Sequence, residues 1–171
     1  MKRSYIAQGS RAYYQAIVAL LFGSLANFGL TYSMQPLLPN VSETFGLLPS
    51  TASLAMSMTT GGMAIGLLLI AGIAGMLERK TTIVVSLIGS AVLMIGASLS
   101  GAFEMILICR ALQGLFIAGF PAAAIAYINE EFDPRTIGTV IGIYIGSNSL
   151  GGLFGRLATV RWQIFTIGIS G

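Results

Sequence analysis

Five long apolar runs, separated by short polar connections, make up most of this 171-residue chain. The runs extend over residues 14–35, 52–76, 82–99, 104–127 and 137–160. A helix that crosses a membrane needs about 20 mainly apolar residues, so each run is a candidate span. Charged residues make up only 9% of the chain, whereas they make up about a quarter of a soluble domain. The sequence therefore predicts an all-α membrane protein, with residues 1–171 forming a single transmembrane helical bundle.

The last ten residues, 162–171, predict a partial sixth span. Ten helical residues reach only about 15 Å at roughly 1.5 Å each, which is half the thickness of the hydrocarbon core. At the other end, the first run is longer than the apolar core of a signal peptide and further spans follow closely. We therefore expect residues 14–35, which end near Pro36 and Pro39, to remain as an uncleaved membrane anchor.

The distribution of basic residues predicts the orientation. Alternate connections on one side carry Lys2, Arg3, Arg11, Arg79, Lys80 and Arg135. Outside the spans, the opposite side carries only Arg161. Since Lys and Arg collect on the cytoplasmic side of membrane proteins, we expect a cytoplasmic amino terminus.

Composition also excludes several classes of chemistry. Histidine is absent and Cys109 is the only cysteine, which excludes histidine metal sites, cysteine clusters and an internal disulfide. The net charge of +3 is not gathered in a basic tract, so nothing favours a nucleic-acid partner. We expect no enzyme, no metal and no cofactor, and the lipid bilayer as the surroundings.

Arg110 lies inside the fourth run, about 9 Å along the helix from Glu104. Gln113 follows one turn later on the same face. An arginine within a membrane is costly, so it is expected to face the bundle interior or a wet cavity. These two donors predict a site for substrate or for coupling. The alternative is an arginine that reaches back to the surface beside Glu104.

A second polar face runs along the first span. Asn27, Thr31 and Gln35 recur at every fourth position and so share one helical stripe. We predict that this stripe lines a substrate cavity, beside possible aromatic contacts from Phe28 and Tyr32. The alternative is that these groups serve only helix packing.

Small residues predict close helix packing. Gly142 and Gly146 lie four residues apart in the fifth run, with Gly151 and Gly152 after them, and the second run repeats the spacing. Such spacing lets membrane helices approach closely. Together with Pro121 in the fourth run, it indicates either a bundle able to rock or bend, or static packing.

Arg110-Ala111-Leu112-Gln113-Gly114 resembles the fourth-helix signature R-x-x-Q-G of the major facilitator superfamily. The likeness extends over residues 23–162 and is to the amino-terminal half of such transporters. Segments 34–39 and 151–156 are similar to those of bacterial drug-efflux-like and sugar-efflux-like members. Gly151-Gly152 is also similar to the end of the family's antiporter motif, with Ser147 and Asn148 in place of its preceding glycine and proline.

The family's cytoplasmic loop motif is retained here only at Arg79-Lys80, and Gly75 stands at its acidic position. The resemblance implies that Arg79 and Lys80 serve a cytoplasmic gate. We expect Arg79 to pair with Glu130 or Glu131 in place of the missing acidic group.

The resemblance implies a secondary active transporter of small molecules, with proton-coupled export of lipophilic or sugar-like compounds as the leading hypothesis. Its partners would be substrate, protons and a second helical bundle, either a carboxyl-terminal half or a second copy. The first alternative is an oligomeric half-size transporter or channel. The second is a truncated membrane protein that transports nothing.

Overall fold

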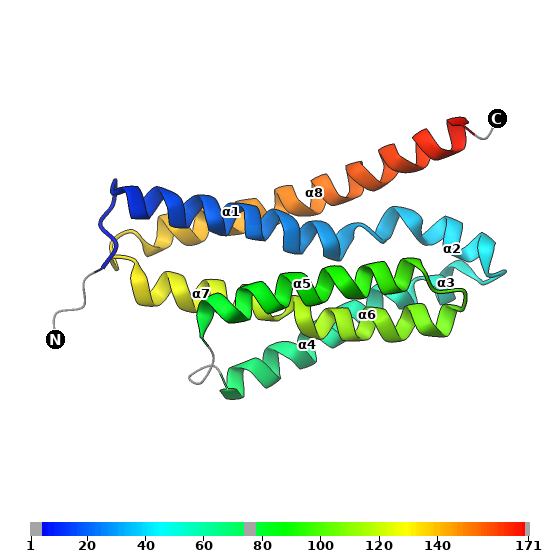
Figure 1. The fold of residues 1–171 in the computed structure, drawn as a ribbon, viewed down its shortest axis with the longest axis horizontal. Coiled ribbons are helices and arrows are strands. Elements are labelled where there is room, and N and C mark those ends of the chain that lie inside the picture. Colours follow the sequence, from blue (N-terminus) through cyan, green and yellow to red (C-terminus); the bar gives the residue numbers. More distant parts are fainter. Residues whose placement is uncertain (1–4, 74–77, 170–171) are drawn as a thin grey trace.

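The computed structural model describes residues 5–73 and 78–169, which are almost entirely helical. The elements are α1 (Arg11–Tyr32), η1 (Gln35–Leu37), α2 (Leu38–Thr44), α3 (Pro49–Ala52), α4 (Leu54–Ile73), α5 (Arg79–Ser98), α6 (Phe103–Ile117), α7 (Gly119–Glu131) and α8 (Ile137–Ile169). They form a bundle of long rods lying side by side (Figure 1). The predicted all-α class is confirmed.

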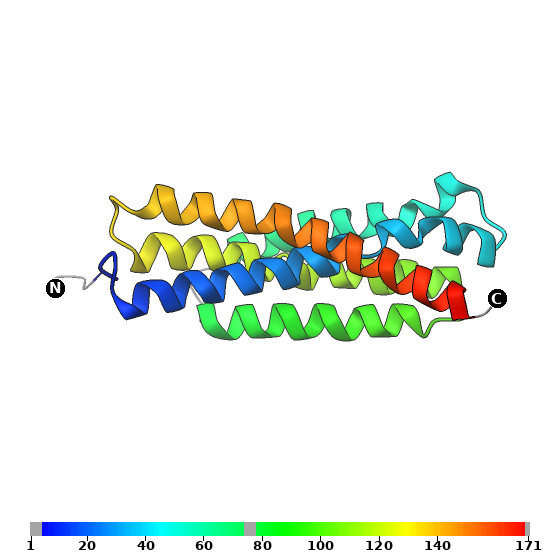
Figure 2. The same ribbon diagram turned by 90° about the horizontal axis from the view of Figure 1, so that it is seen from above.

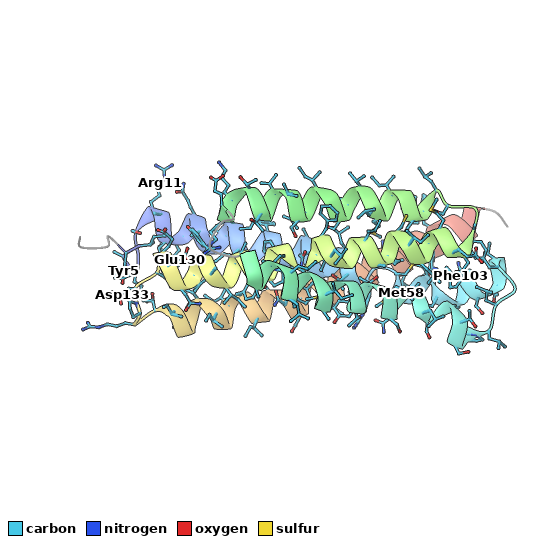
Figure 3. The ribbon with its side chains drawn as sticks, turned by 90° about the horizontal axis from the view of Figure 1, so that it is seen from below. Tyr5, Arg11, Met58, Phe103, Glu130 and Asp133 are labelled. Atoms are coloured by element: carbon cyan, nitrogen blue, oxygen red, sulfur yellow. The ribbon has the colours of Figure 1, made fainter. Side chains whose placement is uncertain are left out.

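Five stretches of the described residues are long and apolar enough to cross a membrane. They are Arg11–Thr44, Pro49–Gly72, Arg79–Ser98, Phe103–Glu131 and Ile137–Phe165. Helices α1, α5 and α8 begin toward one end of the bundle, and α4 and α7 end toward it (Figure 1). Arg11, Glu130 and Asp133 lie at this end and Phe103 lies near the other (Figure 3). We call these the Arg11 end and the Phe103 end.

The first span begins earlier and extends further than the predicted residues 14–35. Ser10 caps α1, its hydroxyl accepting a hydrogen bond from the Tyr13 N–H at 3.1 Å, and this cap fixes the start at Arg11. Pro36 and Pro39 do not end the span, because each lies in the first turn of a new helical segment, η1 or α2. Proline is tolerated there because those N–H groups have no partner within the helix.

The fourth span consists of two helices, α6 and α7, separated at Ala118. Ser86 of α5 is inserted at the break: its hydroxyl donates to the Phe116 carbonyl and accepts from the Phe120 N–H at 2.9 Å. Pro121, without an N–H, follows directly and removes the next helical bond. The hydroxyl from α5, which takes the place of backbone partners in the helical hydrogen bonding, and the adjacent proline together account for the interruption.

The predicted boundary between a fifth span ending at residue 160 and a partial sixth span at 162–171 is wrong. Helix α8 runs without interruption through 33 residues from Ile137 to Ile169, or about 50 Å at 1.5 Å per residue. Arg161, Trp162 and Gln163 include neither Gly nor Pro, so nothing there breaks a helix. The charge of Arg161 does not end the helix, because a charge alone does not interrupt its hydrogen bonds.

Two other boundaries also differ. Helix α5 begins at Arg79, before the predicted residue 82, with Glu78 as its capping residue. Helix α4 begins at Leu54 after the separate turn α3, whereas the prediction was a single helix from residue 52. The predicted end of that span at Met76, and Gly75, lie outside the described residues.

Two helix pairs form the closest contacts of the bundle: α1 with α8, and α4 with α6. Helix α8 crosses over α1 and moves away from it toward its carboxyl end (Figures 1 and 2). At the crossing, Gly151 faces the backbone of Leu25 in α1, and a Cβ at Gly151 would lie only 2.9 Å from the Leu25 Cα. A Cβ on Gly152 would lie 3.1 Å from the Tyr32 ring. Small residues permit this approach.

Gly142 and Gly146 do not take part in this contact. A Cβ at either position would meet nothing within 4 Å among the described residues. Nine residues separate Gly142 from Gly151, which at about 100° per residue puts them on opposite faces of α8. The α1–α8 contact therefore uses only the later glycines.

Two apolar clusters occupy opposite parts of the interior. The larger, toward the Arg11 end, includes Tyr13, Leu20, Phe120, Ile128, Phe132, Val140 and Tyr144. The smaller, toward the Phe103 end, includes Met34, Ala55 and Ile106. Along α1, and along α6 and α7, side chains between these clusters have apolar packing on both sides.

Candidate functional site

Buried polar side chains lie between the two apolar clusters. The buried polar layer comprises Ser24, Asn27, Thr59, Arg110, Gln113 and Ser147. In α1 it falls between Leu20 and Met34, and in α6 and α7 between Ile106 and Phe120. Both intervals are 14 residues, or about 21 Å of helix, so on these helices the layer occupies the middle part of the bundle.

Arg110 carries the charge of the buried polar layer. Its side chain is 1% exposed, and its Nη1 donates to the Gln113 Oε1 at 2.9 Å. The helical spacing of three residues that predicted a shared face thus brings the two side chains into contact. Arg110 does not reach the surface beside Glu104, which is exposed. The alternative in which the arginine snorkels to the surface therefore does not describe this structure.

This pair has hydrogen-bonding capacity left over. Arg110 Nε and Gln113 Nε2 are buried without a hydrogen-bond partner among the described residues, and no described carboxylate forms an ion pair with Arg110. Leaving a buried donor unsatisfied costs about 1–3 kcal/mol, and more for a charged group. The donors are thus arranged to receive an acceptor that the described chain does not supply.

Only part of the predicted stripe of the first span lies in the buried polar layer. Asn27 is completely buried, with neither amide atom hydrogen bonded among the described residues. Thr31 is half-buried and donates to the Asn27 carbonyl at 2.8 Å, within its own helix. Gln35 lies beyond the end of α1, in η1, where it is exposed. Because α1 ends at Tyr32, Gln35 is not part of the layer.

A further polar contact was not predicted. The Ser24 hydroxyl donates to Asn148 Oδ1 at 2.7 Å, which links α1 to α8 beside the buried polar layer. Ser24 lies three residues before Asn27, so helical spacing would have added it to the predicted stripe. Its partner could not be found this way, because the sequence does not say that α8 is the neighbour of α1.

Asn148 also lines a pocket of about 310 Å³ between α1 and α8. The other lining residues are Phe28, Tyr32, Ser149, Gly152, Leu153 and Arg156. Phe28 and Tyr32 are the aromatic residues expected beside the stripe, whereas the sequence patterns do not predict Arg156 as a site residue. The pocket is thus a second polar feature, on the surface of the α1–α8 pair.

At the Arg11 end, Arg79 forms an ion pair with Glu130. The guanidinium binds both carboxylate oxygens, with Nη2 2.6 Å from Oε1 and Nε 3.2 Å from Oε2. The pair links α5 to the end of α7, as one of the two predicted pairings required. Both side chains are partly exposed, at 25% and 46%, so the pair contributes little to the stability of the bundle.

Lys80 and Glu131 are exposed and line a neighbouring pocket of about 520 Å³, with an apolar wall from α1, α5 and α7. Glu131 also holds the amino-terminal segment, since its carbonyl accepts from the Ile6 N–H at 2.7 Å. The charges implied for a gate are therefore gathered at one end of the bundle. Lys2 and Arg3, which entered the prediction of orientation, lie outside the described residues.

The fold and site together define a class: a helical membrane protein with several spans and a buried polar layer that carries a charge and lies between two apolar clusters. The sequence model of the Major Facilitator Superfamily matches residues 20–160. The chain therefore belongs to the Major Facilitator Superfamily, a family of membrane transporters. This agrees with the resemblance found at Arg110 to Gly114.

Individual relatives agree with the family. The chain is 35% identical over 153 residues to the inner membrane transport protein YnfM of Escherichia coli (strain K12), covering 90% of the chain and 37% of the relative. It is 31% identical over 156 residues to the MFS-type transporter YybF of Bacillus subtilis (strain 168), covering 91% and 39%. It is 35% identical over 171 residues to the transporter BU588 of Buchnera aphidicola subsp. Acyrthosiphon pisum (strain APS), covering 99% and 42%.

The chain thus spans about two fifths of the length of these relatives. No solved structure matches it.

Proposed function

We propose that this chain is the amino-terminal helical bundle of a secondary active transporter that exports lipophilic or sugar-like small molecules in exchange for protons. The observation that carries the proposal is the buried Arg110–Gln113 pair, with Arg110 Nε and Gln113 Nε2 unsatisfied. A buried cation with unused donors favours an acceptor that arrives from elsewhere, such as substrate or a titrating carboxylate. Membership in a transporter family supports such a role.

The acceptor for Arg110 is proposed to come with a second bundle. Alternating access requires one helical bundle to rock against another around a shared midplane site. The second bundle is either a separate carboxyl-terminal half or a second copy of this chain, as in an oligomeric half-size transporter. Measuring the mass of the complex in detergent separates these assemblies, since only the second contains two copies of one chain.

The charges at the Arg11 end are proposed to act as the cytoplasmic gate. Arg79 and Glu130 tie α5 to α7, while Lys80 and Glu131 border the pocket beside them. Because the Arg79–Glu130 pair is partly exposed, it can break and re-form at little cost in free energy.

In this proposal the Arg11 end faces the cytoplasm of a bacterial inner membrane, in keeping with the excess of Lys and Arg at that end. Single cysteines at Ser42 and Thr81, in a Cys109→Ser background, test the orientation with an impermeant thiol reagent on intact cells. Labelling is expected at position 42 only. Labelling at position 81 alone would reverse the proposed topology.

Substitution of Arg110 tests the proposed function. Arg110→Lys keeps the charge but loses the planar donor fork, whereas Arg110→Gln keeps polarity and loses the charge. The activity to be measured is proton-gradient-driven movement of lipophilic dyes and labelled sugars, in membrane vesicles from cells that naturally produce the protein. Both variants are expected to lower the rate at least about tenfold.

Arg161→Gln provides the control, because Arg161 is an exposed arginine outside the buried polar layer. It is expected to leave transport unchanged. If both Arg110 variants inserted normally and transported like the parent, the coupling role would have to be abandoned. Absence of any gradient-driven transport by the parent would favour the alternative of a membrane protein that transports nothing.

A further inference from the structure

The pocket between α1 and α8 has a chemical character different from that of the rest of the bundle surface. It measures about 310 Å³ and combines two aromatic rings, an amide, a hydroxyl and one guanidinium group. It lies beside the buried polar layer and shares none of its residues. The combination of a flat apolar wall with a cation is the kind of surface that binds amphipathic ions.

The aromatic wall is formed by Phe28 and Tyr32, one turn apart on α1. Their rings are stacked, with centroids 6.3 Å apart and planes inclined by 26°. Opposite them stands Gly152, where a Cβ would lie 3.1 Å from the Tyr32 ring. The absence of a side chain at Gly152 therefore lets the α8 backbone approach this part of the ring. A flat apolar group can lie against such a wall.

The cation of the pocket is Arg156. Its guanidinium carbon lies 4.8 Å from the centroid of the Tyr32 ring, within the range of a cation–π interaction. Among the described residues no carboxylate lies within ion-pair distance of Arg156. The ring therefore holds the guanidinium in place while its N–H donors remain available. A planar guanidinium binds a carboxylate through two parallel hydrogen bonds, which makes a carboxylate the matching partner.

Asn148 supplies a second point of contact. Its Oδ1 accepts from the Ser24 hydroxyl at 2.7 Å, so the amide oxygen is directed toward Ser24 and the NH₂ group is the donor side. Asn148 and Arg156 are two helical turns apart on one stripe of α8, or about 12 Å along the axis. A ligand that binds both residues would carry a carboxylate at one end and a hydrogen-bond acceptor at the other.

Two faces of α8 differ in polarity. The stripe of Asn148, Gly152 and Arg156 is polar, whereas Leu150, Phe154 and Leu157 form an exposed apolar face on the other side. At 100° per residue, Leu150 and Phe154 each lie about 160° around the helix from Gly152. Only the apolar face suits lipid. The pocket therefore faces away from the lipid side, where water or a second bundle can reach it.

We propose that this α1–α8 pocket is a binding subsite for elongated organic anions: a carboxylate bound by Arg156, a planar apolar body against Phe28 and Tyr32, and a terminal acceptor at Asn148. The inference rests on the proposed transport function, because it names the substrate class. Binding to the pocket can nevertheless be measured without transport, so the two proposals fail separately.

The test uses the purified full chain in lipid nanodiscs with 4′-hydroxybiphenyl-4-carboxylate as the probe. Its neutral partner, 4′-hydroxybiphenyl-4-carboxamide, has the same shape without the charge. Binding is followed by equilibrium dialysis, with empty nanodiscs subtracted to correct for partition into lipid. The parent is expected to bind the carboxylate at least about tenfold more tightly than the carboxamide, because only the anion forms the paired hydrogen bonds with Arg156.

Arg156→Gln is expected to remove this preference, so that both probes bind equally weakly, and Arg156→Lys is expected to retain only part of it. Arg161→Gln serves as the matched control, since it removes a neighbouring arginine outside the pocket, and the preference should persist. Equal binding of the two probes by the parent, no binding at all, or a preference that survives in Arg156→Gln would each overturn the proposal. The comparison of probes on the parent requires no variant to fold.

The outcome also separates this proposal from the proposed function. If the parent binds the anion selectively but its vesicles show no gradient-driven transport, the subsite is supported and the transport function is refuted. If the parent transports but shows no charge-selective binding, the transport function is supported and the subsite is refuted.

Discussion

The contact between α4 and α6 allows a quantitative prediction of how substitutions at two adjacent glycines, Gly61 and Gly62, change the free energy of unfolding. Gly62 is buried against α6, where a Cβ would lie 3.1 Å from the Ala111 carbonyl carbon and 3.3 Å from the Gly114 Cα. Gly61 is exposed, and a Cβ there would meet nothing within 4 Å. The obstructing atoms at Gly62 belong to backbone, so they can yield only if the two helices move apart.

Substitution by alanine separates packing from helix propensity. Both Gly61→Ala and Gly62→Ala gain about 0.8–1.0 kcal/mol of intrinsic helix stability. Only Gly62→Ala also incurs overpacking, which typically costs about 1–3 kcal/mol. Because the propensity gain is common to both, the free energies of unfolding of the two variants should differ by about 1–3 kcal/mol. Gly61→Ala should be the more stable of the two, and more stable than the parent.

The free energy of unfolding can be measured by reversible denaturation in mixed detergent micelles, followed by circular dichroism. Gly114→Ala provides an independent check from the other side of the contact, since a Cβ there would lie 2.7 Å from the Met63 nitrogen. It should destabilise the bundle as Gly62→Ala does. If Gly62→Ala and Gly61→Ala were equally stable, the close approach of α4 and α6 would be refuted.

Two further predictions concern contacts between spans. Replacing either Arg79 or Glu130 by alanine should leave stability nearly unchanged, because the pair is partly exposed, yet should impair gradient-driven transport in vesicles. Exchanging the two charges should restore transport, and failure to do so would argue against the gate. Ser86→Ala should lower the free energy of unfolding in detergent by about 1–3 kcal/mol, because the Phe120 N–H loses its partner. Ser98→Ala on the same helix, which removes only an exposed local bond, should be nearly neutral.

The five spans could be predicted from sequence because lipid allows so few solutions. A chain segment in hydrocarbon must satisfy its backbone groups internally, so a long apolar run is almost always a helix. The pairing of Arg110 with Gln113 followed from the same regularity, since residues three apart share a face. In both cases the relevant interactions lie within one helix.

What could not be predicted depends on contacts between helices or on single capping residues. The interruption at Ala118 requires Ser86 to come from α5, and the Ser24–Asn148 bond requires α1 and α8 to be neighbours. Neither pairing is encoded in the periodicity of a single run. The predicted end of the fifth span at residue 160 is wrong for a different reason: a helix ends where its hydrogen bonds are interrupted and not where a charge such as that of Arg161 appears.

The buried polar layer and the α1–α8 pocket are connected by one hydrogen bond. Ser24 is completely buried in the layer, one turn from Asn27, while its acceptor Asn148 lines the pocket. Along α1 the layer has apolar packing on both sides, and the α1–α8 contact is a route by which an event at the pocket can reach it. A ligand that draws the Asn148 amide outward would weaken the bond from Ser24 and leave another buried hydroxyl unsatisfied beside Asn27. Since an unsatisfied buried group costs about 1–3 kcal/mol, occupancy of the pocket and the arrangement of the layer would be energetically coupled.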